Sequence, residues 1–131
     1  MGVGAAMVKI ANNELLIIKL SGVLDAKALE DLGKELNEIE VTKTYAKRFS
    51  DVDDLKGVTV TSTDIMFYKT CRIESREKIY TAFYACNDFQ FGMARMFQAL
   101  SESEKHAIGI FRDIDSVAQW LHVDGRLLKN K

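Results

Sequence analysis

Residues 78–100 read KIYTAFYACNDFQFGMARMFQAL, and this stretch decides the predicted fold. Residues 78–85 are rich in aromatic and β-branched side chains, a composition typical of a β-strand. Residues 88–101 carry apolar side chains at helical spacing, behind Asn87 or Asp88 as the capping residue. A strand followed directly by an amphipathic helix indicates an α/β protein.

The chain before and after this stretch alternates in the same way. Residues 7–11 and 14–20 flank Asn12-Asn13, and two asparagines tolerate the positive φ of a tight hairpin turn. The second strand contains LLII (15–18), which is apolar on both faces, so we expect it to be covered on both sides before it ends at Ser21-Gly22. Two further elements are a helix behind Asp25 that ends near residue 40 and a strand over 45–50 that runs into an acidic turn over 51–54. The remaining ones are a helix that follows 61–63 and ends at about residue 77, a strand over 107–111, and a helix behind Asp113 that ends at residue 121.

Composition is that of an ordinary globular protein. The chain has 131 residues, of which 47% are apolar, and 18 Lys+Arg stand against 19 Asp+Glu. This length suits one hydrophobic core, and a net charge of −1 provides no basic surface for nucleic acid or an anionic membrane. The expected fold class is therefore a single α/β domain over 1–131, with a mixed sheet, an N-terminal hairpin, about four helices and a polar, frayed tail from about residue 122.

The sequence also predicts a cytoplasmic location. The N-terminus MGVGAAMVKI lacks the charged region and the long apolar run of a signal peptide, and no apolar run approaches the roughly 20 residues of a membrane span. Cys71 and Cys86 form no metal-binding pattern, and we expect two reduced, mostly buried thiols, although sequence alone leaves a disulfide open.

The helix over 88–101 has a predicted core face and a predicted outer face. Winding it at 100° per residue places Phe89, Met93, Met96 and Leu100 on the core face, with Phe97 at the border.

Gly92 costs a helix interior roughly 1 kcal/mol relative to alanine. Because Ala99 follows it on the same flank, we expect the small pair to allow close packing, with a partner's backbone as the alternative. Phe91, Arg95 and Gln98 point away from the predicted core and form the candidate interaction face, since aromatic and arginine side chains are enriched in binding hot spots.

Three segments resemble the SpoIIAA-like family of small bacterial proteins: RFSDVDDLKGV (48–58), NDFQFGMARMFQAL (87–100) and IGIFRDIDSVAQWL (108–121). The resemblance extends from about residue 8 to residue 121. It implies a STAS-like fold, the fold of anti-sigma-factor antagonists, with a relation to the lipid-binding CRAL-TRIO fold. None of the three segments is a catalytic motif, and the biochemical role of most proteins of this family is unknown.

The resemblance also suggests a phosphoacceptor. In anti-sigma-factor antagonists an Asp-Ser motif at a helix N-terminus accepts phosphate, and here Ser62 takes the aspartate position and Thr63 the phosphoserine position. Asp64 would repel the added charge, so capping by Thr61 or Ser62 is the favoured interpretation.

No residue pattern indicates catalysis. Asp51, Asp53 and Asp54 fall in a predicted turn and are expected to be solvated carboxylates rather than metal ligands. The sequence contains no Ser-His-Asp or Cys-His arrangement and no glycine-rich phosphate loop. We therefore expect no catalytic residue, no metal and no cofactor.

Two functions remain. The first is a non-enzymatic regulatory or protein-interaction module that binds a protein partner and is expected to self-associate as a homo-oligomer. The alternative is a protein that binds a small apolar, lipid-like ligand. The residues predicted to line such a cavity are Met66, Phe67, Met93, Met96 and Phe97.

Overall fold

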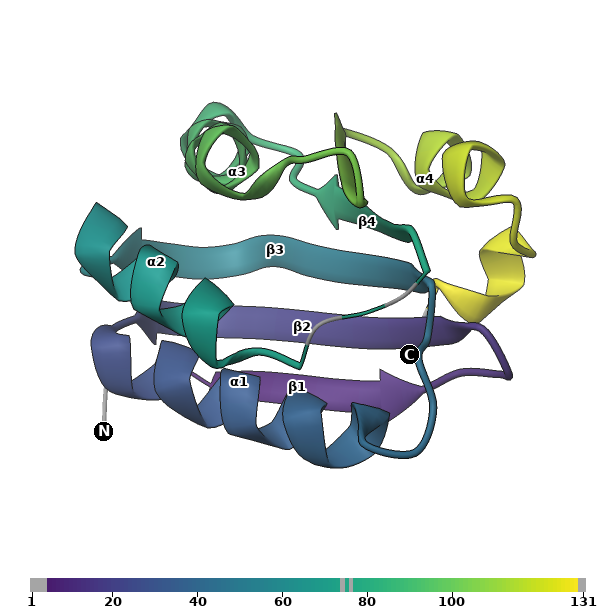
Figure 1. Cartoon of the computed structure of the whole chain (residues 1–131). Helices are drawn as coiled ribbons and strands as arrows, with labels where there is room; N and C mark the ends of the chain where they lie inside the picture. The colour runs from purple at the N-terminus through teal and green to yellow at the C-terminus, as the bar shows by residue number, and fades with distance from the viewer. Residues whose placement is uncertain (1–4, 74, 76, 130–131) are drawn as a thin grey trace.

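A computed structural model describes residues 5–73, 75 and 77–129 of the chain, which build one five-stranded sheet and four α-helices (Figure 1). Residues 1–4, where the N-terminal stretch tested for a signal peptide begins, lie outside the described residues. The elements in chain order are β1 (Ala5–Ile10), β2 (Leu15–Leu24), α1 (Ala26–Glu40), β3 (Lys47–Val58), α2 (Ser62–Cys71), β4 (Ile79–Tyr84), α3 (Asp88–Ser101), β5 (His106–Phe111), α4 (Ile114–Leu121) and the 3₁₀ turn η1 (Gly125–Leu127).

The strands lie in the sheet in the order of the sequence, β1-β2-β3-β4-β5. β1 and β2 form the predicted antiparallel hairpin, in which the Asn12 carboxamide oxygen accepts hydrogen bonds from the backbone N–H groups of Glu14 (2.9 Å) and Leu15 (3.0 Å). All later neighbours are parallel. The predicted fold class, a mixed α/β sheet with an N-terminal hairpin and four helices, is confirmed.

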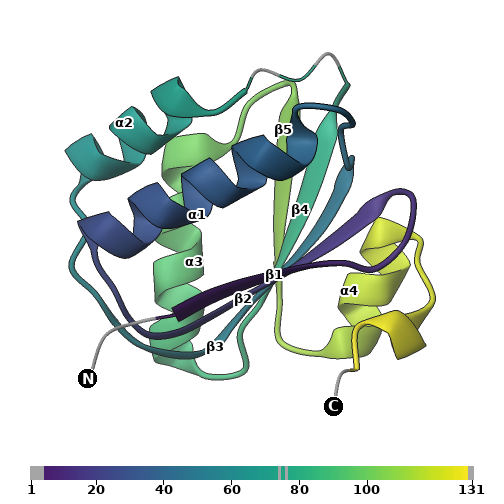
Figure 2. The same cartoon turned by 90° about the horizontal axis from the view of Figure 1, so that it is seen from below.

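The helices form two unequal layers on the sheet. Figure 2 shows α1, α2 and α3 on one face, and α4 with η1 on the other. β2 lies between them, and its consecutive residues Leu15 and Leu16 are fully buried in different cores. The prediction that β2 is covered on both sides is therefore confirmed.

Two strands are longer than predicted. β2 continues through Ser21-Gly22, because Gly22 adopts a positive φ of 69° and the pairing with β3 shifts register nearby, so that the chain bulges instead of turning away. The predicted acidic turn over 51–54 is wrong, since these residues belong to β3. Val52 and Leu55 anchor that part of the strand in the core.

The ends of α2 and of the chain also differ from prediction. α2 ends at Cys71 rather than near residue 77, because Arg72 adopts an extended conformation and turns toward α1; Glu74 and Arg76 lie outside the described residues. The tail beyond Leu121 is not frayed up to residue 129, since Leu128 is buried beside α4.

Candidate functional site

Polar side chains line the sheet beneath α1–α3 at the start of the parallel strands. Arg48 and Ser50 occupy alternate positions of β3 and so share one face. Arg48 pairs in register with Thr81 of β4, and all three residues are buried. A row of buried polar groups on a central strand requires partners, because an unpaired polar group in the core is costly.

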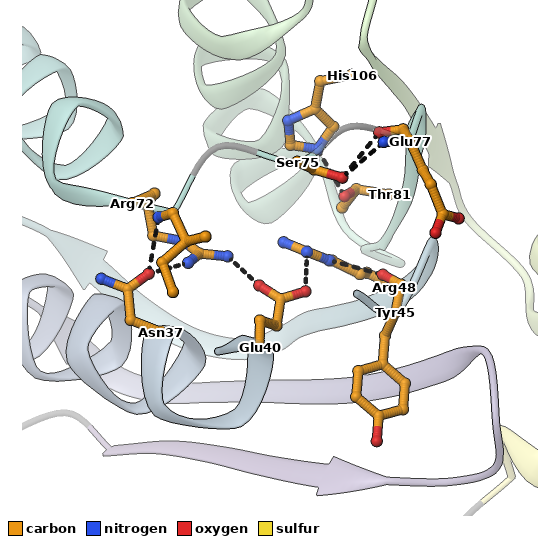
Figure 3. A network of polar contacts seen from close by, with 10 residues as sticks. Asn37, Glu40, Tyr45, Arg48, Arg72, Ser75, Glu77, Thr81 and His106 are labelled. Carbon is orange, nitrogen blue, oxygen red and sulfur yellow. Dashed lines mark hydrogen bonds and ion pairs between the residues drawn. The ribbon is translucent and has the colours of Figure 1, made fainter. Parts of the chain in front are cut away.

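Glu40 supplies the partner for Arg48 from the last residue of α1. Its carboxylate accepts hydrogen bonds from Arg48 Nη2 and from Arg72 Nη2, the latter at 2.6 Å (Figure 3). Arg72 Nη1 also donates to the Asn37 side chain, and Arg48 Nε donates to the Tyr45 carbonyl at 3.3 Å. Glu40, Arg48 and Arg72, called the arginine cluster below, therefore join the end of α1, the start of β3 and the end of α2.

The arginine cluster holds two positive charges against one negative charge. The side chains of Glu40, Arg48 and Arg72 are only 5%, 9% and 12% exposed. Burial lowers the pKa of Arg48, and the Glu40 carboxylate opposes this effect. Arg48 Nη1 has no hydrogen-bond partner among the described residues. The cluster thus carries an excess positive charge and a free donor.

His106, at the start of β5, lies beside this cluster. Its Nε2 shares a hydrogen bond with Thr81 Oγ1 at 2.8 Å (Figure 3). Burial, followed by the positive charges of Arg48, Arg72 and Lys69, lowers the pKa of His106 to about 4, so the ring is neutral at pH 7. Within the described part of the chain no carboxylate hydrogen-bonds to the ring, so the pair lacks the third group that orients a catalytic base.

A cavity of about 110 Å³ extends from the arginine cluster into the core. Leucine, isoleucine and phenylalanine side chains from the sheet and from α1–α3 form most of its wall, while Arg48, Ser50, Thr81 and His106 form its polar side. Outside it lies a groove of about 650 Å³. The residues that line both spaces are Arg48, Tyr68, Ser101 and His106.

Most of the residues predicted to line an apolar cavity lie elsewhere. Phe97 does line the cavity of about 110 Å³, and Met93 is buried in the same core. Met66 and Met96 are exposed, and Phe67 lines a different groove of about 280 Å³ between α1 and α2. The prediction therefore failed for most of its residues.

The predicted face of α3 is rotated around the helix. The buried residues are Gln90, Met93, Ala94 and Phe97, while Phe89 is 54% exposed. The reason is Gln90, which lies inside although it is polar: its amide nitrogen donates to the Leu55 carbonyl, while its buried Oε1 has no hydrogen-bond partner among the described residues.

The candidate interaction face is divided by this rotation. Phe91 is half-buried, with the Arg112 guanidinium 4.3 Å from its ring centre, and Gln98 donates to the Ile108 carbonyl at 2.8 Å. Arg95 alone of the three is exposed. The outward direction predicted for Phe91 and Gln98 is wrong, and a role of the three residues in an interface stays a prediction.

Gly92 does not serve close packing. It is exposed, and a Cβ built on it would meet no heavy atom within 4 Å. We therefore expect Gly92→Ala to raise the free energy of unfolding by up to about 1 kcal/mol, because alanine restricts the unfolded chain and clashes with nothing. Urea unfolding would measure this, with Ala99→Gly on the same exposed flank expected to lower stability by a similar amount. A destabilised Gly92→Ala variant would contradict this assignment.

The predicted cap of α2 is confirmed. Thr61 Oγ1 accepts from the Asp64 backbone N–H at 3.1 Å, and the Asp64 carboxylate accepts from the Thr61 N–H at 2.9 Å, which is a complete capping box. Ser62 and Thr63 are exposed in the first turn. Phosphorylation of either residue stays a prediction.

The acidic residues lie on β3, Cys71 ends α2, and Cys86 follows β4. Asp51, Asp53 and Asp54 belong to β3, and Asp54 pairs with Lys19 at 3.2 Å. Within residues 5–73, 75 and 77–129 no group of three or more acidic, histidine or cysteine side chains is arranged to hold a metal ion. Both cysteines are free and exposed, so the predicted burial of the thiols is wrong.

Met66 of α2 and Phe89 and Met96 of α3 are large apolar side chains exposed to solvent, and they are called the α2–α3 face below. Phe89 and Met96 are seven residues apart and therefore lie two turns apart on one side of α3. α2 and α3 pack together, and Lys69 Nζ donates to the Leu100 carbonyl at 2.8 Å. No helix in the described part of the chain is both long and apolar enough to span a membrane.

No protein-family model and no curated protein matches the sequence. Solved structures do match. An uncharacterized protein of the DUF3478 family with a SpoIIAA-like fold, from Shewanella loihica PV-4, has a TM-score of 0.62 at 16% identity, over 90% of this chain and 93% of that chain. The unphosphorylated anti-sigma factor antagonist SpoIIAA has a TM-score of 0.55 at 11% identity, over 92% and 99% of the two chains. The phosphorylated form of the Bacillus cell fate determinant SpoIIAA has a TM-score of 0.54 at 13% identity, over 88% and 99%. These likenesses, with the observed order of elements, show that the chain has the SpoIIAA-like fold.

Proposed function

We propose that this protein is a non-enzymatic regulatory module that binds a partner protein through the α2–α3 face. The observation that carries the proposal is the exposure of large apolar side chains there: Met66 is 50% exposed, Phe89 54% and Met96 38%. Large apolar side chains left in water on two helices that pack together are typical of a surface that another molecule covers.

The chemistry of this face favours an amphipathic helix as the occupant. Methionine side chains are flexible and polarizable, so Met66 and Met96 can adapt to an apolar helix laid along the face, and Phe89 offers a large rigid ring. A partner protein is also consistent with the similar fold of SpoIIAA, which is described as an anti-sigma factor antagonist and therefore acts on another protein.

The test uses the double variant Met66→Ser with Met96→Ser. Serine removes apolar area at two exposed positions, so we expect a thermal midpoint within a few degrees of the parent and at least a tenfold loss of partner protein captured from cells of the source organism. Phe67→Ser is the matched control, because Phe67 is 62% exposed on the same helix but lines the groove toward α1.

Equal capture by the parent and the double variant would overturn the proposal. Light scattering over a concentration series tests whether a second copy of this chain covers the face instead of a different protein. A doubling of mass in the parent that the double variant abolishes would assign the face to the second copy.

A further inference from the structure

The cavity beneath α1–α3 combines an apolar interior with a charged entrance. Its inner wall contains Leu20, Leu32, Phe83 and Phe97, and Arg48 lines both the cavity and the groove outside it. A dry apolar cavity of roughly 150 Å³ accommodates a molecule the size of benzene, so a cavity of about 110 Å³ holds the end of a hydrocarbon chain. The rest of a longer chain fits in the groove outside the cavity.

The entrance is suited to an anion. The arginine cluster has two guanidinium groups and one carboxylate, so an anionic group at Arg48 Nη1 would balance its excess charge. Figure 3 shows the guanidinium of Arg48 directed toward Arg72, with no hydrogen bond between the two arginines. Among the described residues, the outer groove is lined by four basic side chains, Arg48, Lys69, Arg72 and Lys105, and by two acidic ones, Glu77 and Glu104, so these residues carry more positive than negative charge.

We infer that this site binds a single-chain amphiphile with an anionic headgroup, with the end of the chain in the cavity and the headgroup in the groove at Arg48 and Arg72. The residues that line this site do not include Met66, Phe89 or Met96, so the inference does not depend on the α2–α3 face. Guanidinium groups form charge-assisted hydrogen bonds with carboxylate and phosphate oxygens, so Arg48 Nη1 can donate to either headgroup.

The neck of the site adds selectivity. Ser101, Tyr68 and His106 line both the cavity and the groove, so they lie where a ligand would pass from the groove into the cavity. His106 is neutral at pH 7 and adds no charge of its own, which leaves the two arginines to distinguish an anionic headgroup from a neutral one.

The test is a ¹H–¹⁵N NMR titration of the full chain with octanoate, octyl phosphate, octanol and inorganic phosphate. Octanoate and octyl phosphate are expected to shift the amides of β3 and β4 around Ser50 and Thr81, and to bind at least tenfold more tightly than octanol or inorganic phosphate. A stronger response to one of the two anionic amphiphiles identifies the headgroup.

Two variants localise the site. Arg72→Gln is expected to weaken octanoate binding at least tenfold and to leave octanol binding unchanged. The control is Arg126→Gln, which replaces an exposed arginine of η1 on the opposite face of the sheet and should change the binding of neither ligand. Ser101→Leu narrows the neck at a half-buried position and should weaken both ligands with little effect on folding.

Three results would overturn the inference. They are the absence of shifts around Ser50 and Thr81 at millimolar octanoate, equal affinity for octanoate and octanol, and binding of inorganic phosphate as tight as that of octyl phosphate. None of them bears on capture of a partner protein by the α2–α3 face, so the two proposals fail separately.

Discussion

Glu40→Ala is expected to lower the free energy of unfolding by about 3–5 kcal/mol, because it leaves two buried guanidinium groups without their shared carboxylate. The Glu40 side chain is 5% exposed and bonds to Arg48 and Arg72. Glu40 is also the last residue of α1, where a negative charge is unfavourable to the helix dipole. Its position is explained by the two arginines and not by the helix.

Denaturant unfolding with Glu38→Ala as the matched control would measure this effect. Glu38 lies in the same turn of α1 but is exposed, so its replacement should change stability by less than about 0.5 kcal/mol. Similar effects of the two substitutions would mean that the arginine cluster contributes nothing specific to the fold, and a headgroup site built on it would lose its basis.

Phe97→Ala is expected to cost about 3–5 kcal/mol, the range for loss of a large buried aromatic side chain. Phe97 is 9% exposed, stacks on Phe83 with ring centres 6.0 Å apart, and forms part of the cavity wall. Its removal should enlarge the cavity. We therefore expect octanoate to raise the melting temperature of this variant more than that of the parent.

Phe89→Ala is the control on the same helix. Phe89 is 54% exposed, so its truncation should alter stability by less than about 1 kcal/mol and should not change octanoate binding. If Phe97→Ala were as stable as Phe89→Ala, the buried face of α3 described above would be incorrect.

Local sequence signals predicted the order of strands and helices well. Asn12 at the hairpin, Asp25 before α1, Thr61 before α2 and Asn87 before α3 each make the hydrogen bonds expected of a turn or cap residue. These bonds join residues two or three positions apart, so the sequence alone contains the information.

Features that depend on distant partners were not predicted. Gln90 is buried because the Leu55 carbonyl, on another element, accepts its amide, and a periodicity rule that counts glutamine as polar places α3 in the wrong rotation. The arginine cluster brings together positions 40, 48 and 72 from three elements. One signal was present: Arg48 and Ser50 alternate on a strand between two apolar ones, where polar residues need buried partners.

Hydrogen–deuterium exchange on the chain in complex with its captured partner protein tests the central claim most directly. The proposed function predicts slower amide exchange in peptides that cover α2 (Ser62–Cys71) and α3 (Asp88–Ser101) than in the free chain, with no change in α4 (Ile114–Leu121) on the opposite face of the sheet. Slower exchange in α4 or in β1, with α2 and α3 unchanged, would contradict it.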